Sequence, residues 1–149
     1  MNKLPWHVVG VDDFRFKIAP SRVHGFGLFA KANLPCGAVV TQLTGQRMHI
    51  ADIQRLKASL DVPASLKDYF FMEWNHLGET VVVARPFRTV YSYINHSRTP
   101  NCRILGQPGT QDWRVEVVEE IAEGQELLLD YRDEHLPREY LVGHGSTYL

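Results

Sequence analysis

Residues 93–102 read Tyr-Ile-Asn-His-Ser-Arg-Thr-Pro-Asn-Cys, and they decide the fold together with residues 126–131, which read Glu-Leu-Leu-Leu-Asp-Tyr. The first stretch joins an apolar lead-in to small polar residues and a Pro-Asn turn, a composition that favours neither an ordinary strand nor a helix. The second ends an apolar run on Asp130 and Tyr131, which places a phenol where a buried strand meets the surface. We therefore expect both stretches to serve more than packing.

Length and composition indicate one soluble globular domain, residues 1–149. The chain has 149 residues, of which 44% are hydrophobic and 22% charged, and these proportions are ordinary for such a domain. A formal net charge of -1 argues against a large surface for phosphate backbones or anionic lipid. No apolar run approaches the length of a membrane span. We expect no direct nucleic-acid binding and no membrane binding.

The cysteines and histidines form no pattern typical of a disulfide framework or a metal site. Cys36 and Cys102 are far apart and belong to no Cys-x-x-Cys pair. The histidines include no His-x-His or His-Glu-x-x-His ligand pair. We expect no metal and, because two free thiols suit a reducing compartment and the N-terminus lacks an uninterrupted apolar region, a cytoplasmic location.

Hydrophobic periodicity predicts a compact, mainly β domain with one inserted helix. Ile50, Ile53, Leu56 and Leu60 recur at helical spacing, which predicts a helix over residues 49–60. The tail, residues 132–149, is polar and is expected to form a short helix and an irregular arm. Strands are predicted at residues 14–18, 23–30, 38–44, 69–74, 79–84, 102–105, 113–117 and 126–131, with 69–74 and 79–84 paired as a hairpin.

Two glycines surround one aromatic residue in Gly25-Phe26-Gly27. Glycine permits positive φ and lets another group approach the main chain, so the segment is either a hairpin bend or the backbone of a binding site. It lacks the third glycine and acidic follower of a dinucleotide fingerprint. A nucleophile triad is poorly supported as well, since Ser97 directly follows His96 and no Gly-x-Ser-x-Gly elbow occurs.

Four elements in a fixed order resemble the successive signatures of the SET-domain protein lysine methyltransferases. The resemblance runs from about Ser21 to Tyr131 and implies a β-clip of small curved sheets, with a knot-like C-terminal crossing of the two stretches quoted first. The elements are Gly25-Phe26-Gly27, Thr44-Gly45, Asn95-His96-Ser97 with Pro100-Asn101-Cys102, and Glu126-Leu127 with Asp130-Tyr131.

The resemblance also implies an activity, which is transfer of a methyl group from S-adenosylmethionine to the ε-amine of a lysine in a protein, with S-adenosylhomocysteine as product. Tyr131 is implied as the catalytic tyrosine. The cofactor-binding residues are implied to be Gly25, Phe26, Gly27, Asn95 and His96. The lysine amine must be neutral to react, and its pKa of about 10.4 falls in an apolar channel near a sulfonium.

Departures from the family pattern concern the substrate channel, for which the resemblance implies Tyr93, Leu129 and Leu43. Leu43 stands where the family often has tyrosine, and Leu129 where an aromatic residue often sets the number of methyl groups. Ser92 stands where an arginine is common. These changes leave the degree of methylation open. Leu43 and Leu129 also motivate an alternative, a catalytically weakened SET-like domain that binds a peptide or partner along a strand edge. A purely structural oligomer module is a third hypothesis.

Arg98 occupies a position where many family members carry a zinc-ligating cysteine, and residues 132–149 contain no cysteine. The resemblance is therefore to minimal, stand-alone members without zinc. We expect the tail to close the lysine channel through Leu136, Tyr140 or Tyr148, either within one chain or from the partner in a homodimer. If the substrate is a chromosomal protein, association with the nucleoid or chromatin is expected.

Overall fold

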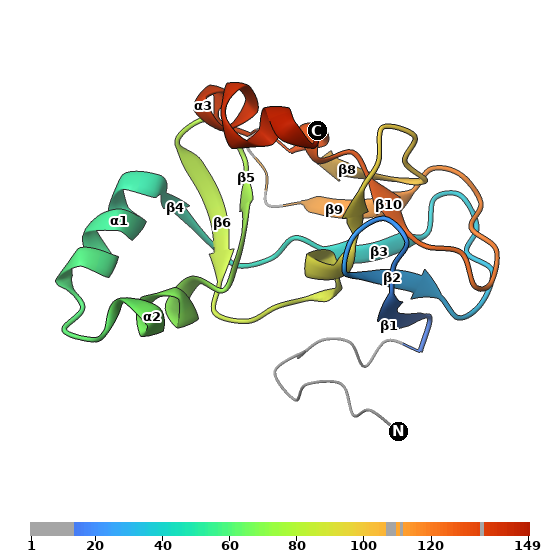
Figure 1. The fold of residues 1–149 in the computed structure, drawn as a ribbon, viewed down its shortest axis with the longest axis horizontal. Helices are drawn as coiled ribbons and strands as arrows, with labels where there is room; N and C mark the ends of the chain where they lie inside the picture. The colour runs from blue at the N-terminus through green and yellow to red at the C-terminus, as the bar shows by residue number, and fades with distance from the viewer. Residues whose placement is uncertain (1–13, 107–109, 111, 135) are drawn as a thin grey trace.

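The computed structural model describes residues 14–106, 110, 112–134 and 136–149, which form three small sheets and several short helices (Figure 1). Short strands and frequent turns follow from the spacing of glycine, proline and asparagine in the sequence. The strands are β1 (Phe16–Pro20), β2 (Phe26–Ala30), β3 (Val39–Gln42), β4 (Gln46–His49), β5 (Glu73–His76), β6 (Val81–Arg85), β7 (Asn95–His96), β8 (Cys102–Gly106), β9 (Trp113–Val117) and β10 (Leu128–Leu129). The α-helices are α1 (Ile50–Ser59), α2 (Ala64–Lys67) and α3 (Arg138–Val142), and the 3-10 helices are η1 (Asp68–Phe71), η2 (Val90–Tyr93), η3 (Tyr131–Asp133) and η4 (His144–Thr147).

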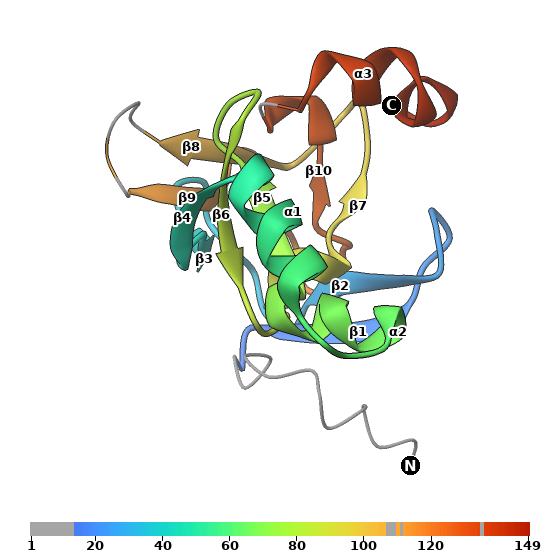
Figure 2. The ribbon, with the colours of Figure 1, turned by 90° about the vertical axis from the view of Figure 1, so that its left-hand side faces the viewer.

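The largest sheet contains the crossing predicted from the sequence. Its order is β3-β9-β8-β10-β7, and β10 pairs in parallel with both β7 and β8. Because β7 and β8 are joined by residues 97–101, β10 lies between the two ends of one loop, as Figure 2 shows from the side. The predicted mainly β fold, with small sheets and a knot-like crossing, is confirmed.

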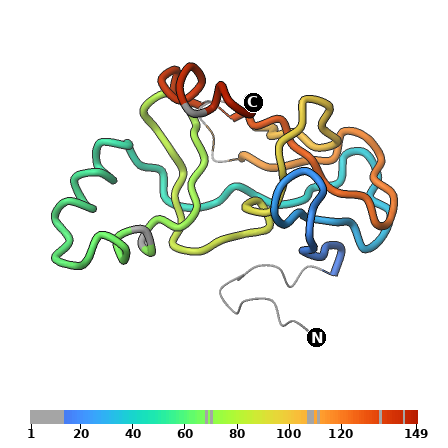
Figure 3. Tube along the Cα trace, viewed as in Figure 1, coloured from blue at the N-terminus to red at the C-terminus, as the bar shows by residue number. Residues whose placement is uncertain are grey.

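A second sheet, β4-β6-β5, is inserted between β3 and η2 and carries α1 and α2 on its outer end (Figure 3). The expected hairpin is present, since β5 pairs antiparallel with β6. The strand expected over residues 69–74 is wrong in its first half, because residues 68–71 form η1 and β5 begins only at Glu73. The reason is a lack of partners, since β6 ends opposite Glu73 at Arg85.

Two hydrophobic clusters form the described core. The larger cluster joins the five-stranded sheet, which carries the crossing, to the β1-β2 sheet. It includes Leu28, Ile94, Leu127 and Leu129, all at most 1% exposed. The smaller cluster lies between the inserted sheet and α1, and Ile53 is the one residue of α1 that is buried in it. Leu56 is 45% exposed, so the apolar face of this helix is narrower than its spacing predicts. Among the described residues, no helix has the length and apolar character needed to cross a membrane.

The number and the bounds of the short helices and strands differ from those predicted from the sequence. Besides the one helix predicted from periodicity and the one expected in the tail, the structure has α2 and four 3-10 helices. β4 was not predicted, because its residues Gln46–His49 form a strand only by pairing with β6. The strand expected to run to Tyr131 ends at Leu129, and Tyr131 begins η3.

Candidate active site

Asn101 holds the crossing together from within the loop that joins β7 to β8. Its side-chain amide donates to the carbonyl of Glu126 (2.9 Å), and its side-chain oxygen accepts from the N–H of Leu128 (2.8 Å). Its main-chain N–H also donates to the Leu128 carbonyl (3.2 Å). An amide side chain that satisfies main-chain groups on both sides removes the cost of burying them unpaired. Tyr131 therefore leaves β10 in a defined direction.

The glycine-containing loop is joined to the same crossing by Asn95. The side-chain amide of Asn95 donates to the carbonyls of His24 (3.0 Å) and Phe26 (3.1 Å). It also contacts Glu126, whose Oε1 lies 2.9 Å from the amide nitrogen. Glu126 in turn accepts from the hydroxyl of Ser21 (2.7 Å). Three segments that are distant in the sequence thus meet at one carboxylate, which fixes the loop relative to the crossing.

Glycine suits the two positions in this loop for different structural reasons. Gly25 has φ of +47° with open space beside it, a conformation that suits glycine. Gly27 is buried, and a Cβ there would lie 2.2 Å from Oε1 of Glu126 and 3.1 Å from Cβ of Ser21. The second glycine is therefore required by the close approach of Glu126.

His96 and Tyr131 pack together at the end of the crossing. The N–H of Tyr131 donates to Nδ1 of His96 (3.1 Å), and the ring centroids are 5.1 Å apart. Because Nδ1 accepts, a neutral His96 carries its proton on Nε2. That Nε2 is buried, and no described atom is its hydrogen-bond partner. A buried donor without an acceptor is costly in a protein alone and is a group that a bound ligand can satisfy.

The Tyr131 hydroxyl is held by the main chain just after η2. It donates to the carbonyl of Ile94 at 2.7 Å. Burial raises the pKa of Tyr131 to about 12, with smaller contributions from Tyr148 and from the negative charge of Glu134. The phenol is therefore protonated at neutral pH and acts as a hydrogen-bond donor rather than as a base.

A cavity of about 490 Å3 opens beside the Tyr131 ring. The tail supplies Leu136, Tyr140 and Tyr148 to its wall, the three residues named from the sequence for closing the channel. In this structure they come from the same chain. The other lining residues, from the inserted sheet, η2 and η3, are Met72, Glu73, Trp74, Arg88, Tyr91, Ser92 and Glu134.

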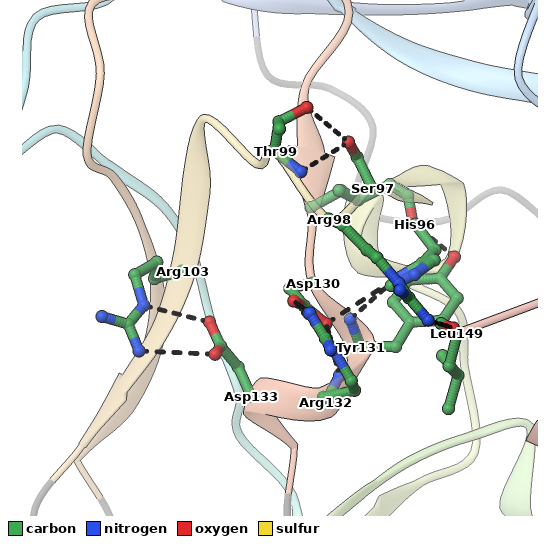
Figure 4. A network of polar contacts seen from close by, with 11 residues as sticks. His96, Ser97, Arg98, Thr99, Arg103, Asp130, Tyr131, Arg132, Asp133 and Leu149 are labelled. Carbon is green, nitrogen blue, oxygen red and sulfur yellow. Dashed lines mark hydrogen bonds and ion pairs between the residues drawn. The ribbon is translucent and has the colours of Figure 1, made fainter. Parts of the chain in front are cut away.

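Arg98 joins the tail to the crossing, as Figure 4 shows. Its guanidinium donates a hydrogen bond to the main-chain carbonyl of Leu149. A second arginine, Arg103 on β8, pairs with Asp133 just after Tyr131 (3.2 Å). The position where many family members have a zinc-ligating cysteine thus makes a polar contact with the last residue of the tail. Among the described side chains, no group of three or more histidine, cysteine, aspartate or glutamate residues is arranged to hold a metal ion.

A buried ionic network supports the segment that leads to Asn95. Arg85, 1% exposed, pairs with Glu73 at 2.6 Å and donates to the carbonyl of Thr44 at 2.8 Å. Glu73 accepts from the N–H and the hydroxyl of Thr89 (2.9 and 2.6 Å) and from the hydroxyl of Ser92. The network therefore joins the inserted sheet to η2, and Ser92 takes part in it.

The residues expected in the channel lie in three different places. Leu129 is fully buried in the larger core cluster. Leu43 is 2% exposed and lines a separate cavity of about 140 Å3 with Trp113. Tyr93 is half-buried and packs against the larger core cluster. Among the described residues, these three do not line the cavity beside Tyr131, and their role in substrate binding stays a prediction.

Sequence reasoning missed Tyr91 and Glu134, which line the cavity. The Tyr91 hydroxyl donates to a carboxylate oxygen of Glu134 at 2.6 Å, and the N–H of His76 donates to the other oxygen. The residues flanking Glu134 read Arg-Asp-Glu-His, which resembles a solvated surface segment. The one feature of the sequence that indicates a place near the site for Glu134 is that it follows Tyr131 by three residues.

Comparison with known proteins places the chain in a family. The model of the SET domain family matches residues 25–132, and the chain belongs to this family. It is 32% identical over 122 residues to the histone-lysine N-methyltransferase ATX2 of Arabidopsis thaliana, which covers 79% of this chain and 11% of that protein. It is 29% identical over 131 residues to the histone-lysine N-methyltransferase TRX1 of Oryza sativa, covering 83% and 12%.

A fungal relative has a similar identity and coverage. The chain is 29% identical over 117 residues to the H3 lysine-4 specific histone-lysine N-methyltransferase of Schizosaccharomyces pombe, covering 76% of this chain and 12% of that protein. The chain thus spans about a tenth of the length of these relatives. The predicted family membership is confirmed.

Proposed function

We propose that this protein transfers a methyl group from S-adenosylmethionine to the ε-amine of a lysine in a protein substrate. The observation that carries the proposal is the position of Tyr131, which joins two parts of the site. Its main-chain N–H binds His96 of the crossing, and its ring lines the aromatic cavity. Membership of the SET domain family and the similarity to histone-lysine N-methyltransferases support the same reaction.

The residues of the glycine loop and the crossing fit the cofactor. Gly25 leaves open space beside an exposed main chain, and Phe26 presents a side chain that is 60% exposed. The buried Nε2 of His96 is a hydrogen-bond donor that needs an acceptor. We expect Gly25, Phe26, Gly27, Asn95 and His96 to hold the cofactor, which supplies an activated methyl group.

The chain's own residues align the acceptor amine and exclude water. Tyr131 keeps its proton and is anchored on the Ile94 carbonyl, so its hydroxyl has a fixed position beside the cavity. Aromatic residues of η2 and the tail surround the space in which a lysine side chain would lie. Such a site contributes orientation and a low dielectric constant rather than covalent chemistry.

Methyl transfer requires cofactor binding, so calorimetric titration of the protein with S-adenosylmethionine is the first test. Saturable binding is expected, and its absence would contradict the enzyme function. Transfer of a labelled methyl group to histone H3 and to a mixture of cellular proteins is the second measurement. Histone H3 is the first candidate because the Schizosaccharomyces pombe relative is an H3 lysine-4 specific enzyme.

A catalytically weakened domain that binds a peptide is the second candidate function. The burial of Leu129 in the core favours it, because that residue brings no polar group to the cavity beside Tyr131. This function predicts binding of lysine-bearing peptides without transfer of the labelled methyl group. Any labelled product that depends on Tyr131 would exclude it.

A further inference from the structure

The cavity beside Tyr131 contains two carboxylates in different electrostatic situations. Glu73 is paired with Arg85 at 2.6 Å, so its charge is compensated inside the protein. Glu134 accepts hydrogen bonds from Tyr91 and from the N–H of His76, and both donors are neutral. Among the described residues, no cation forms an ion pair with Glu134. The positive charge of Arg85 acts on Glu134 from nearby, but Arg85 is paired with Glu73, so the negative charge of Glu134 remains available to a ligand.

Keeping this charge in the cavity has a cost to the folded protein. Burial raises the pKa of Glu134, and hydrogen bonds from Tyr91, His76 and Asn75 together with the positive charge of Arg85 oppose that shift without cancelling it. A carboxyl group that binds its proton more tightly when folded lowers stability at every pH above its ordinary pKa of 4.5. The arrangement thus disfavours the charged form of Glu134 unless a cation enters the cavity.

We propose that the Glu134 carboxylate is the counter-ion that receives the ε-ammonium group of the substrate lysine. The proposal rests on the proposed function and adds to it the residue that recognises the charge of the side chain. Tyr91 holds the carboxylate from one side, and Tyr131 lines the same cavity. The site thereby selects a long aliphatic side chain that ends in a cation, before the amine loses its proton and reacts.

The other charges near the cavity are consistent with this selection. Arg88 also lines the cavity, but it is exposed and donates to the hydroxyl of Ser92 at 3.4 Å, so solvent screens its charge. The rings of Tyr140 and Tyr148 meet edge to face, with centroids 6.4 Å apart. Tyrosine faces attract cations, so the tail wall favours the ammonium group as well.

The test compares binding of N-acetyl-lysine methylamide and its neutral analogue N-acetyl-norleucine methylamide, measured by NMR titration without cofactor. Wild-type protein is expected to bind the lysine compound about ten-fold more tightly than the norleucine compound. Glu134→Gln should remove this preference while its melting temperature at pH 7 stays equal or rises. Glu139→Gln is the matched control, since it removes the same charge from an exposed position on α3, and it should retain the preference.

Two results would overturn the inference. One is a wild-type protein that does not distinguish the lysine from the norleucine compound. The other is a Glu134→Gln variant that keeps the preference, which would make Glu134 a structural residue. Because these titrations contain no S-adenosylmethionine, a failure of cofactor binding would reject the proposed function separately from the role of Glu134.

Discussion

The guanidinium of Arg98 donates a hydrogen bond to the carbonyl of Leu149, and this contact ties the tail to the loop of the crossing. Leu136, Tyr140 and Tyr148 of the same tail line the cavity beside Tyr131. The contact at Arg98 therefore influences the wall of the cavity, although Arg98 is itself exposed. In this structure a polar contact and aromatic packing hold the tail.

Arg98→Ala should loosen the tail while leaving the rest of the fold intact. We expect faster hydrogen exchange over residues 136–149 and a fall in turnover of about five-fold, because one exposed hydrogen bond contributes about 1 kcal/mol. Hydrogen exchange followed by mass spectrometry measures the first effect. Arg55→Ala, which removes an exposed arginine that pairs with Asp52 within α1, is the control. Unchanged exchange in the tail would show that Arg98 does not hold it.

Gly27→Ala should damage the cofactor site through a steric contact. The new Cβ would lie 2.2 Å from Oε1 of Glu126, so the carboxylate that binds Asn95 and Ser21 must move. We expect a loss of about 1–3 kcal/mol in unfolding free energy and weaker S-adenosylmethionine binding, measured by denaturation and calorimetry. Gly78→Ala is the control, because no atom lies within 4 Å of its added Cβ. Equal effects of the two changes would refute the role of Gly27.

Tyr131→Phe should separate cofactor binding from methyl transfer. The change removes the hydroxyl and its hydrogen bond to the Ile94 carbonyl, but it keeps the ring that packs on His96. We expect the dissociation constant for S-adenosylmethionine to change little and turnover to fall by about a hundred-fold or more. Tyr69→Phe, at a side chain that is 61% exposed, should behave as wild type. Full turnover in Tyr131→Phe would exclude Tyr131 from catalysis.

Arg85→Met should be among the most destabilising single changes in the inserted sheet. It leaves Glu73 buried without its cation, and such losses cost about 3–5 kcal/mol. Chemical denaturation measures the effect. The double variant Arg85→Met, Glu73→Met is expected to recover part of the lost stability, because no unpaired charge remains. A single variant as stable as wild type would contradict the importance of the pair.

Alkaline pH should destabilise the protein through Tyr91 and Tyr131. Burial raises both pKa values from 10.0, that of Tyr131 to about 12 and that of Tyr91 well above its ordinary value. The folded protein then holds these protons more tightly than the unfolded chain, so their contribution is complete below pH 10 and is lost as pH rises through the folded pKa. Denaturation between pH 9 and 12 tests this. Tyr91→Phe should show a shallower loss, and an identical pH profile would contradict the shift.

The class of fold was predictable from the sequence because its signals are local. The segment Trp113–Val117 forms a strand with the bounds predicted from its alternation, and Cys102–Gly106 extends the predicted strand by one residue. The Asn95–His96 strand and the segment that ends at Tyr131 meet at the crossing, as the family resemblance implied. Elements that depend on a distant partner were less predictable, since η1 replaced a predicted strand where β6 supplies no pairing residue.

The sequence by itself determined, through its resemblance to the SET-domain family, which segments cross and which tyrosine lies at their end, because the motifs that carry the resemblance are local and recognisable without their neighbours. Only the tertiary structure decided what surrounds that tyrosine. Glu134 appears in the sequence as part of a charged surface segment, yet the fold places it in the cavity beside Tyr91. Leu129 and Leu43 pack elsewhere. The physical reason is that burial and the local dielectric constant depend on segments distant in the chain. The pKa of a residue and the interactions of its charge are therefore set only when these segments pack together.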